Sequence, residues 1–422
     1  MIKMIDEKLK NYMYGFIEDI CNEIGPRESG TEAEILAGNK IEGELKNFCD
    51  ETCQEEYISS PHAFLGGIRY GALLVLIAVT FYWMSLLIDL NIFQIEPYFN
   101  TFFLIIAIVL IIITVSYFIL ETMKYYELFD FMFPKKKSKN IIGTINPSSG
   151  TIKSTIIFSA HHDSAFEFNT FYYLKRFGQI IINVGYLAVV LILIGIILKL
   201  IFFLLSIDFI IFFFSVGILY LCFTPITIPY ILFHSYKPVL GAYDNLSGVA
   251  VVLGIGKFLS DNKENIPKNT RIHLISFAGE EAGLRGAKRY VKQHYKELIE
   301  NKVIDVNTDS IGKRDIIVIH NKESGIGAKH DPKIYQVILR IAKNLNPNAK
   351  ILPLPFGATD AAAFSKKGIS ATSIGSLNLK EELAPYYHTR NDTPEVVDKE
   401  ALGQFLEICL NYLKIIDEDI EN

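Results

Sequence analysis

The sequence predicts an α/β fold whose soluble part is interrupted by two inserted transmembrane α-helical hairpins, with four membrane helices in total. Short apolar runs typical of strands alternate with helical patterns, most clearly from Gly241 to the C-terminal end. Half of the 422 residues are hydrophobic, and the mean hydropathy is +0.28. This apolar excess is concentrated in two blocks, which predicts membrane segments within an otherwise soluble chain.

Residues 1–66 are predicted to form the first soluble part. Apolar residues at helical spacing from Tyr12 to Ile20 indicate a helix that ends before Gly25-Pro26. Thr31, followed by acidic residues, has the pattern of an N-cap and predicts a second helix. The charged, amphipathic start is typical of a helix and not of a signal peptide. The five cysteines show no framework spacing, so we expect reduced thiols without structural disulfides.

The first apolar block, residues 67–120, is predicted to be a transmembrane hairpin. Tyr70 to Ile88 and Pro97 to Leu120 contain no charged residue. Each is about 20 residues long, which is enough to span a bilayer core. A pair of buried soluble helices is the alternative, but soluble helices of this length would show a polar face.

The second apolar block, residues 174–236, is predicted to be another hairpin. Its spans are Phe177 to Leu198 and Phe209 to about Phe233, and Pro225 and Pro229 should kink the last helix. Because a hairpin returns to the side it left, the soluble parts 1–66, 121–173 and 237–422 lie on one membrane face and fold together. Lys and Arg gather beside the spans on that side, which predicts that it is the cytoplasmic face. These residues are Arg69, Lys124, Lys135, Lys136, Lys137, Lys175, Arg176 and Lys237.

Side chains suited to metal binding occur at the ends of several expected strands and in polar loops. His161 and Asp163 close an apolar run, and residues two apart on a strand share a face. Each motif alone has a plain alternative, such as a helix N-cap, an acidic turn or a surface histidine. Imidazole and carboxylate ligands together suit zinc, with Mn²⁺ or Co²⁺ as substitutes. Two imidazoles and three acids exceed the needs of one open zinc site and suit two metals that share a carboxylate. The five candidate ligands are His161, Asp244, Glu281, Asp309 and His388.

Taken together, these motifs resemble the co-catalytic di-zinc aminopeptidases of metallopeptidase family 28. The resemblance runs from Gly25-Pro26-Arg27 to the last helix and implies a zinc-exopeptidase-type mixed sheet flanked by helices. It further implies that His161 and Asp309 hold one zinc, that Glu281 and His388 hold the other, and that Asp244 bridges the two. In the same resemblance, Asp163 orients His161, Glu280 is the general base for a metal-bridging water, and Tyr387 stabilises the oxyanion. Ala361 follows Asp360 where the family often has His, which affects the pocket and not metal binding.

The expected function is therefore that of a membrane-anchored zinc aminopeptidase that releases N-terminal residues from peptides. Its expected partners are peptides and the lipid bilayer, and a net charge of −5 without a basic stripe argues against nucleic acid. A glutaminyl cyclase, a carboxypeptidase that uses Arg285 or Arg390 as its cation, and a non-catalytic receptor remain alternatives. A transporter is disfavoured because the spans carry almost no charge. The preferred residue and the oligomeric state stay open.

Overall fold

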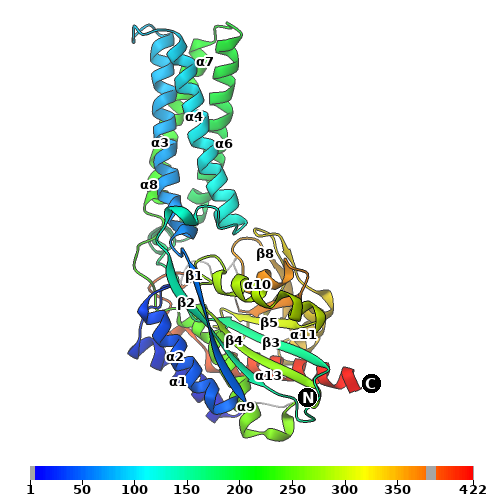
Figure 1. Ribbon diagram of the computed structural model, residues 1–422. Coiled ribbons are helices and arrows are strands. Elements are labelled where there is room, and N and C mark those ends of the chain that lie inside the picture. Colours follow the sequence, from blue (N-terminus) through cyan, green and yellow to red (C-terminus); the bar gives the residue numbers. More distant parts are fainter. Residues whose placement is uncertain (1–4, 377–385, 422) are drawn as a thin grey trace.

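The structure, a computed structural model, describes residues 5–376 and 386–421. It consists of an α/β domain and a bundle of long helices that projects from one end of that domain (Figure 1). The three soluble parts of the sequence come together in the α/β domain, and both hairpins contribute to the bundle (Figure 1). Segments on both sides of each hairpin thus contribute to the α/β domain.

The described residues form one mixed sheet of nine strands in the order β1-β2-β4-β3-β5-β9-β6-β7, with β8 paired to β6. The four central strands, β4, β3, β5 and β9, run parallel to one another, and the flanking pairs β1–β2, β2–β4 and β6–β9 are antiparallel. The strand bounds are β1 (Glu51–Ser59), β2 (Lys136–Ile145), β3 (Ser154–His161), β4 (Thr270–Phe277), β5 (Ile304–Asp309), β6 (Val318–Glu323), β7 (Ala328–Lys329), β8 (Lys350–Leu354) and β9 (Ser370–Gly375).

Helices cover both faces of this sheet. Alternate residues of β3 point to opposite sides, so Ile156 and Phe158 pack into one core while Ile157 packs into the other. The larger core is built with helices α1 (Glu7–Glu23), α2 (Glu32–Phe48), α9 (Ser247–Asp261), α11 (Pro332–Leu345) and α13 (Lys399–Glu421). The smaller core is built with α10 (Arg285–Glu300) and α12 (Ala361–Ser365). Thr31 caps α2 as predicted, because its side chain accepts a hydrogen bond from the Glu34 N–H.

Four helical segments in the described residues are long and apolar enough to cross a membrane. Hairpin 1 comprises α3 (Ala63–Asp89) and α4 (Tyr98–Ser116), which continues as the π-helix η1 (Tyr117–Met123). Its helices therefore begin before residue 67 and end after residue 120, the predicted borders. Hairpin 2 comprises α6 (Arg176–Leu204) and a last segment that runs through α7 (Ile210–Phe223), the 3₁₀ turn η3 (Thr224–Ile226) and α8 (Thr227–Ile231). The interruption falls at Pro225, one of the two prolines expected to kink this helix.

A polar cluster joins the two hairpins at the end of the bundle that is far from the sheet. Lys199 of α6 is buried, and its Nζ lies 2.5 Å from Asp89 Oδ2 and 2.7 Å from Ser85 Oγ. Asn100 of α4 also donates a hydrogen bond to Asp89. Charged groups inside an apolar bundle need such partners. The cluster therefore connects α3, α4 and α6 and makes one bundle of the two hairpins.

Candidate metal centre

The candidate ligands converge at one edge of the parallel strands. His161 is the last residue of β3, Asp309 is the last residue of β5, and Glu280 and Glu281 lie on the turn that follows β4. Since β4, β3 and β5 are parallel neighbours, their carboxyl ends meet at the same edge, where α/β proteins commonly place their sites. Asp244 comes to this edge from the turn before α9.

Asp244 lies between the two histidines. Its Oδ1 is 3.2 Å from His161 Nε2, and its Oδ2 is 3.2 Å from His388 Nε2. On one side, His161 Nε2 is also 3.8 Å from Asp309 Oδ2. On the other side, His388 Nε2 is 3.2 Å from Glu281 Oε1. The Asp244 carboxylate thus faces one ligand group with each oxygen.

Three triads among the described residues have the geometry of metal sites, because the ligand atoms of each all lie within 4.8 Å of one another. One triad is His161 with Glu280 and Glu281, and the other two overlap at Asp244. Of these two, one adds His161 and Asp309, and the other adds Glu281 and His388. These are the groupings that the family resemblance implies for the two zinc ions. No two of these five residues are closer than 28 positions in the sequence, so only the fold brings them together.

The charge balance of the centre fits bound cations. Burial, with the nearby Asp244 carboxylate, raises the pKa of Asp309 to about 7. Burial lowers the pKa of His388, but the carboxylates of Glu281 and Asp244 outweigh it and raise that pKa to about 10. Buried acids crowded in this way stay ionised only beside compensating positive charge. The donor set of two imidazoles and several carboxylates matches the preferences of divalent zinc.

Asp163 fixes the turn that carries Glu280 and Glu281. Its Oδ1 accepts a hydrogen bond from the Glu280 N–H at 3.0 Å, and its Oδ2 accepts one from the Glu281 N–H at 3.1 Å. Its Oδ1 also lies 3.4 Å from His161 Nδ1, on the ring side opposite Asp244. Asp163 therefore orients the predicted base and ligand as well as the imidazole. The preceding residue, His162, points elsewhere, and its Nδ1 lies 2.8 Å from Ser276 Oγ.

Glu280 lies beside the ligands without forming part of either triad around Asp244. Its Oε2 is 3.8 Å from His161 Nε2. Burial raises the pKa of Glu280 well above its ordinary value. The nearby His161 lowers this pKa, whereas the carboxylates of Glu281 and Asp360 raise it further. A carboxyl with a raised pKa next to a reacting water suits the role of a general base.

Three further residues support the centre and were not singled out from the sequence. Asp392 accepts hydrogen bonds from the N–H groups of Tyr243 at 2.6 Å and Asp244 at 3.1 Å. The buried guanidinium of Arg27 donates to the carbonyl oxygens of His162 and Leu240, which ties the β3 end to the Asp244 turn. Asp360, whose two carboxylate oxygens are buried and have no hydrogen-bond partner among the described residues, lies near Glu280. Sequence spacing offers no signal for such contacts, although Arg27 and Asp360 both stand in motifs of the family resemblance.

Asp392→Asn is expected to weaken zinc binding about 10- to 100-fold, the usual effect of losing a group that orients a ligand. The amide would present an N–H₂ group to one of the two backbone N–H groups that the carboxylate now accepts. Zinc affinity measured by competition with a chelator checks this. Asp261→Asn, an exposed change at the end of α9, is the control, and equal affinity in both variants would contradict the role of Asp392.

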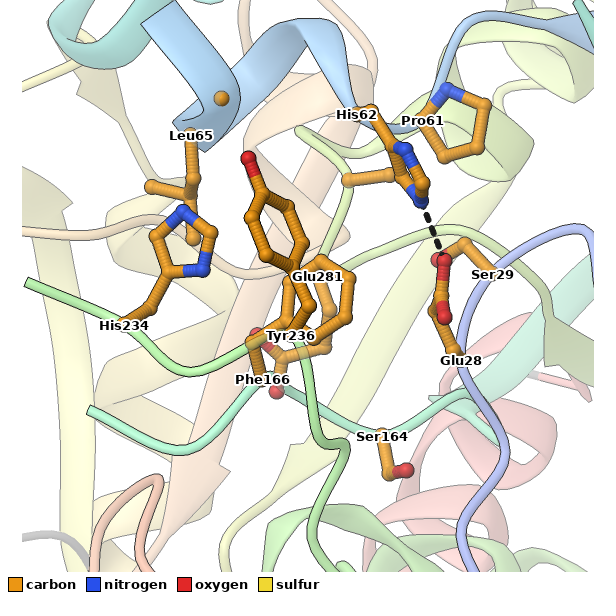
Figure 2. Close-up of a pocket in the computed structure, with 12 residues that line it drawn as sticks. Glu28, Ser29, Pro61, His62, Leu65, Ser164, Phe166, His234, Tyr236 and Glu281 are labelled. Carbon is orange, nitrogen blue, oxygen red and sulfur yellow. Dashed lines mark hydrogen bonds and ion pairs between the residues drawn. The ribbon is translucent and has the colours of Figure 1, made fainter. Parts of the chain in front are cut away.

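Tyr387 and the flanks of both hairpins approach the centre. The Tyr387 ring stacks on His388 with centroids 3.9 Å apart. On the hairpin side, Glu281 lines a small hollow together with His62 and Leu65 from the start of hairpin 1 and His234 and Tyr236 from the exit of hairpin 2 (Figure 2). The ends of the two hairpins that adjoin the α/β domain therefore lie next to Glu281, a candidate ligand.

The two arginines considered for a carboxypeptidase are both engaged. Arg285 is buried and forms ion pairs with Glu121, Glu127 and Asp130. Arg390 is more exposed, but its guanidinium contacts both carboxylate oxygens of Glu167, at 2.6 and 2.9 Å. Neither side chain presents an unpaired cation to the centre.

A family model described as peptidase family M28 matches residues 226–413. The match covers less than half of the chain and shows that these residues are similar to peptidase family M28. The matched region includes Asp244, Glu280, Glu281, Asp309 and His388, and it begins after His161 and after the first hairpin. The similarity to peptidase family M28 is therefore shown for the C-terminal part of the chain.

Known proteins similar to this chain include an aminopeptidase in sequence and zinc aminopeptidases in fold. Aminopeptidase YwaD of Bacillus subtilis (strain 168) is 27% identical over 169 residues, which are 39% of this chain and only 35% of that relative. The zinc aminopeptidase BSAP from Bacillus subtilis superposes with a TM-score of 0.54 at 15% identity, covering 96% of this chain and 94% of that chain. A Bacteroides thetaiotaomicron glutaminyl cyclase bound to N-acetylhistamine superposes with a TM-score of 0.54 at 14% identity, covering 98% of both chains. The structural matches show that the fold is shared.

Proposed function

We propose that this M28 protein is a membrane-anchored zinc aminopeptidase that removes N-terminal residues from peptides. The observation that carries the proposal is the position of Asp244, whose two carboxylate oxygens each lie 3.2 Å from the Nε2 atom of a different histidine. A carboxylate shared by two ligand groups is the arrangement of a two-metal hydrolase. The names of its relatives support an aminopeptidase within that class.

We assign His161 and Asp309 to one zinc, Glu281 and His388 to the other, and Asp244 to both. Two zinc ions held there would polarise the scissile carbonyl and lower the pKa of the attacking water. Asp163 and Asp392 would keep two of these ligands in position. Asp163 fixes the backbone of the turn that carries Glu281, and Asp392 fixes that of the turn that carries Asp244.

Glu280 would move the proton during hydrolysis. As a carboxylate it accepts the proton of the attacking water, and as an acid it passes that proton to the leaving amine. Asp163 keeps Glu280 aimed at the centre by accepting its backbone N–H. The Tyr387 hydroxyl would donate a hydrogen bond to the oxyanion that forms at the carbonyl carbon.

The membrane anchor in this proposal is the four-helix bundle. The length and apolar character of the four segments support membrane crossing, and the soluble parts assemble at one end of the bundle. The excess of Lys and Arg at that end supports a cytoplasmic active site. The hairpin flanks around Glu281 would then place the centre close to the bilayer surface.

The test is to purify the full chain in detergent, count the bound zinc and assay peptides with free and blocked N-termini. We expect two zinc ions per chain and hydrolysis that requires a free amino terminus. Cleavage of blocked peptides with no cleavage of free ones would sink the aminopeptidase proposal. A chelator followed by zinc should abolish and restore the activity.

A glutaminyl cyclase is the second candidate, because one structural neighbour is a glutaminyl cyclase from Bacteroides thetaiotaomicron. Peptides that begin with glutamine distinguish the two functions, since a cyclase converts them to a pyroglutamyl product without shortening them. Mass spectrometry of the product reads this directly. The complete five-ligand set favours two metals and hydrolysis. It also argues against a non-catalytic receptor, in which the ligands would be free to change.

A further inference from the structure

The segment that follows hairpin 1 buries its acidic side chains and exposes most of its apolar ones. Residues 126–132, here called the 126–132 loop, begin three positions after the last residue of the second candidate span, Met123. The two acids of the loop point inward, and the Glu127 and Asp130 side chains are only 14% and 23% exposed. The large apolar residues point outward: Tyr126 is 55% exposed, Leu128 52%, Phe131 81% and Met132 61%. A loop in contact with water would show the opposite pattern.

The 126–132 loop is attached to the end of hairpin 1 that adjoins the α/β domain. The Phe129 ring packs against Tyr117 of η1 with centroids 5.2 Å apart. The next aromatic residue after the loop, Phe133, lies directly against Gly66 of α3, where an added Cβ would come within 2.8 Å of the ring. These contacts keep the outward apolar side chains at the level where α3 and α4 would leave the bilayer.

The inward acids meet one buried cation. Arg285 Nη1 lies 2.8 Å from Asp130 Oδ2 and 2.8 Å from Glu127 Oε2, and its Nη2 lies 3.1 Å from Glu121 Oε1. Glu127 also pairs with Arg289 at 2.6 Å and with Lys288. When one partner of such a buried ion pair moves away, the other charge is left uncompensated, which destabilises the fold. The position of the 126–132 loop is therefore coupled to Arg285.

Arg285 in turn holds the turn that carries the predicted base. Its Nε donates to the Ala282 carbonyl oxygen at 2.9 Å, and its backbone N–H donates to the Gly279 carbonyl oxygen at 2.7 Å. Glu280 and Glu281 lie between these two acceptors along the chain. The contacts run without a gap from the outward apolar residues, through the inward acids and Arg285, to the turn beside the metal centre.

We propose that the 126–132 loop inserts its apolar side chains into the surface of the bilayer that the hairpins span, and that this contact positions Glu280 and Glu281 through Arg285. The occupant of the surface is lipid, because the apolar residues continue directly from a candidate span and basic residues flank them. Arg285 is a positioning residue and not a catalytic one. The positioning half of the proposal rests on the proposed function, whereas the lipid contact does not.

Lipid contact is tested without any activity measurement. Trp83 is the single tryptophan, so Phe131→Trp in a Trp83→Phe background provides one reporter at the tip of the loop. In proteoliposomes that contain lipids with brominated acyl chains, we expect its fluorescence to be quenched. Tyr295→Trp in the same background is the control, because Tyr295 is an exposed aromatic residue on α10. Equal quenching of the two reporters, or no quenching of the reporter in the loop, would overturn the lipid contact.

Positioning is tested by kinetics in the same proteoliposomes. The triple change Leu128→Ser, Phe131→Ser and Met132→Ser should lower kcat about tenfold or more, while KM and zinc content stay as they were. The control replaces three exposed apolar residues of the α/β domain: Leu36→Ser, Ile152→Ser and Ile299→Ser. An unchanged kcat, or a loss of zinc that accounts for the fall, would overturn positioning. If the parent protein has no peptidase activity, the proposed function is wrong. The fluorescence experiment would still test the lipid contact.

Discussion

Glu280→Gln is expected to lower kcat for peptide hydrolysis by about 10²- to 10⁴-fold, the range that general-base catalysis contributes. The amide keeps the size of the side chain but accepts no proton from the attacking water. Zinc binding should persist, because Glu280 belongs to neither triad that contains Asp244. The measurement is a steady-state assay on a peptide with a free amino terminus, together with a zinc count on the same sample.

The control for this variant is Glu300→Gln, the same change at an exposed position at the end of α10. It should leave both kcat and zinc content as in the parent protein. Retention of full activity by Glu280→Gln would show that another group takes the proton. Loss of zinc along with activity would instead show that Glu280 is a metal ligand. The zinc would then be bound by the triad of His161, Glu280 and Glu281.

Asp244→Asn is expected to have a larger effect on metal content than any other single change at the centre. Asp244 is the residue common to the two triads built from the five candidate ligands, and a neutral amide would remove the negative charge that two bound cations would share. We expect zinc to fall from two ions per chain to one or fewer, with hydrolysis lost in parallel. Zinc can be counted by elemental analysis after gel filtration in chelator-free buffer.

A second measurement separates metal loss from unfolding. His161→Ala should remove the ligand group on one side only, so it should retain more zinc than Asp244→Asn. Circular dichroism of both variants should match the parent, since the α/β core and the helix bundle are built from other residues. Equal zinc content in the two variants would contradict a bridging Asp244.

The sequence by itself determined the elements whose signals are local. Thr31 and the acids after it are enough to start α2, and two uncharged stretches of sufficient length are enough to indicate a hairpin. Strand β1 escaped notice because Glu51–Ser59 is acidic and largely exposed at the edge of the sheet, which leaves little apolar periodicity to detect.

The candidate ligands were also named from the sequence, because each stands in a short motif that resembles the M28 pattern. Only the tertiary structure decided which residues hold them in place. Asp392 accepts a hydrogen bond from the Asp244 backbone, and Asp163 accepts one from the Glu280 backbone. Arg285 joins the turn of Glu280 to hairpin 1 through Glu121. Each of these contacts joins residues more than a hundred positions apart and satisfies a buried charge. Burial is a property of the assembled fold, so the need for such a partner has no local signature in the chain.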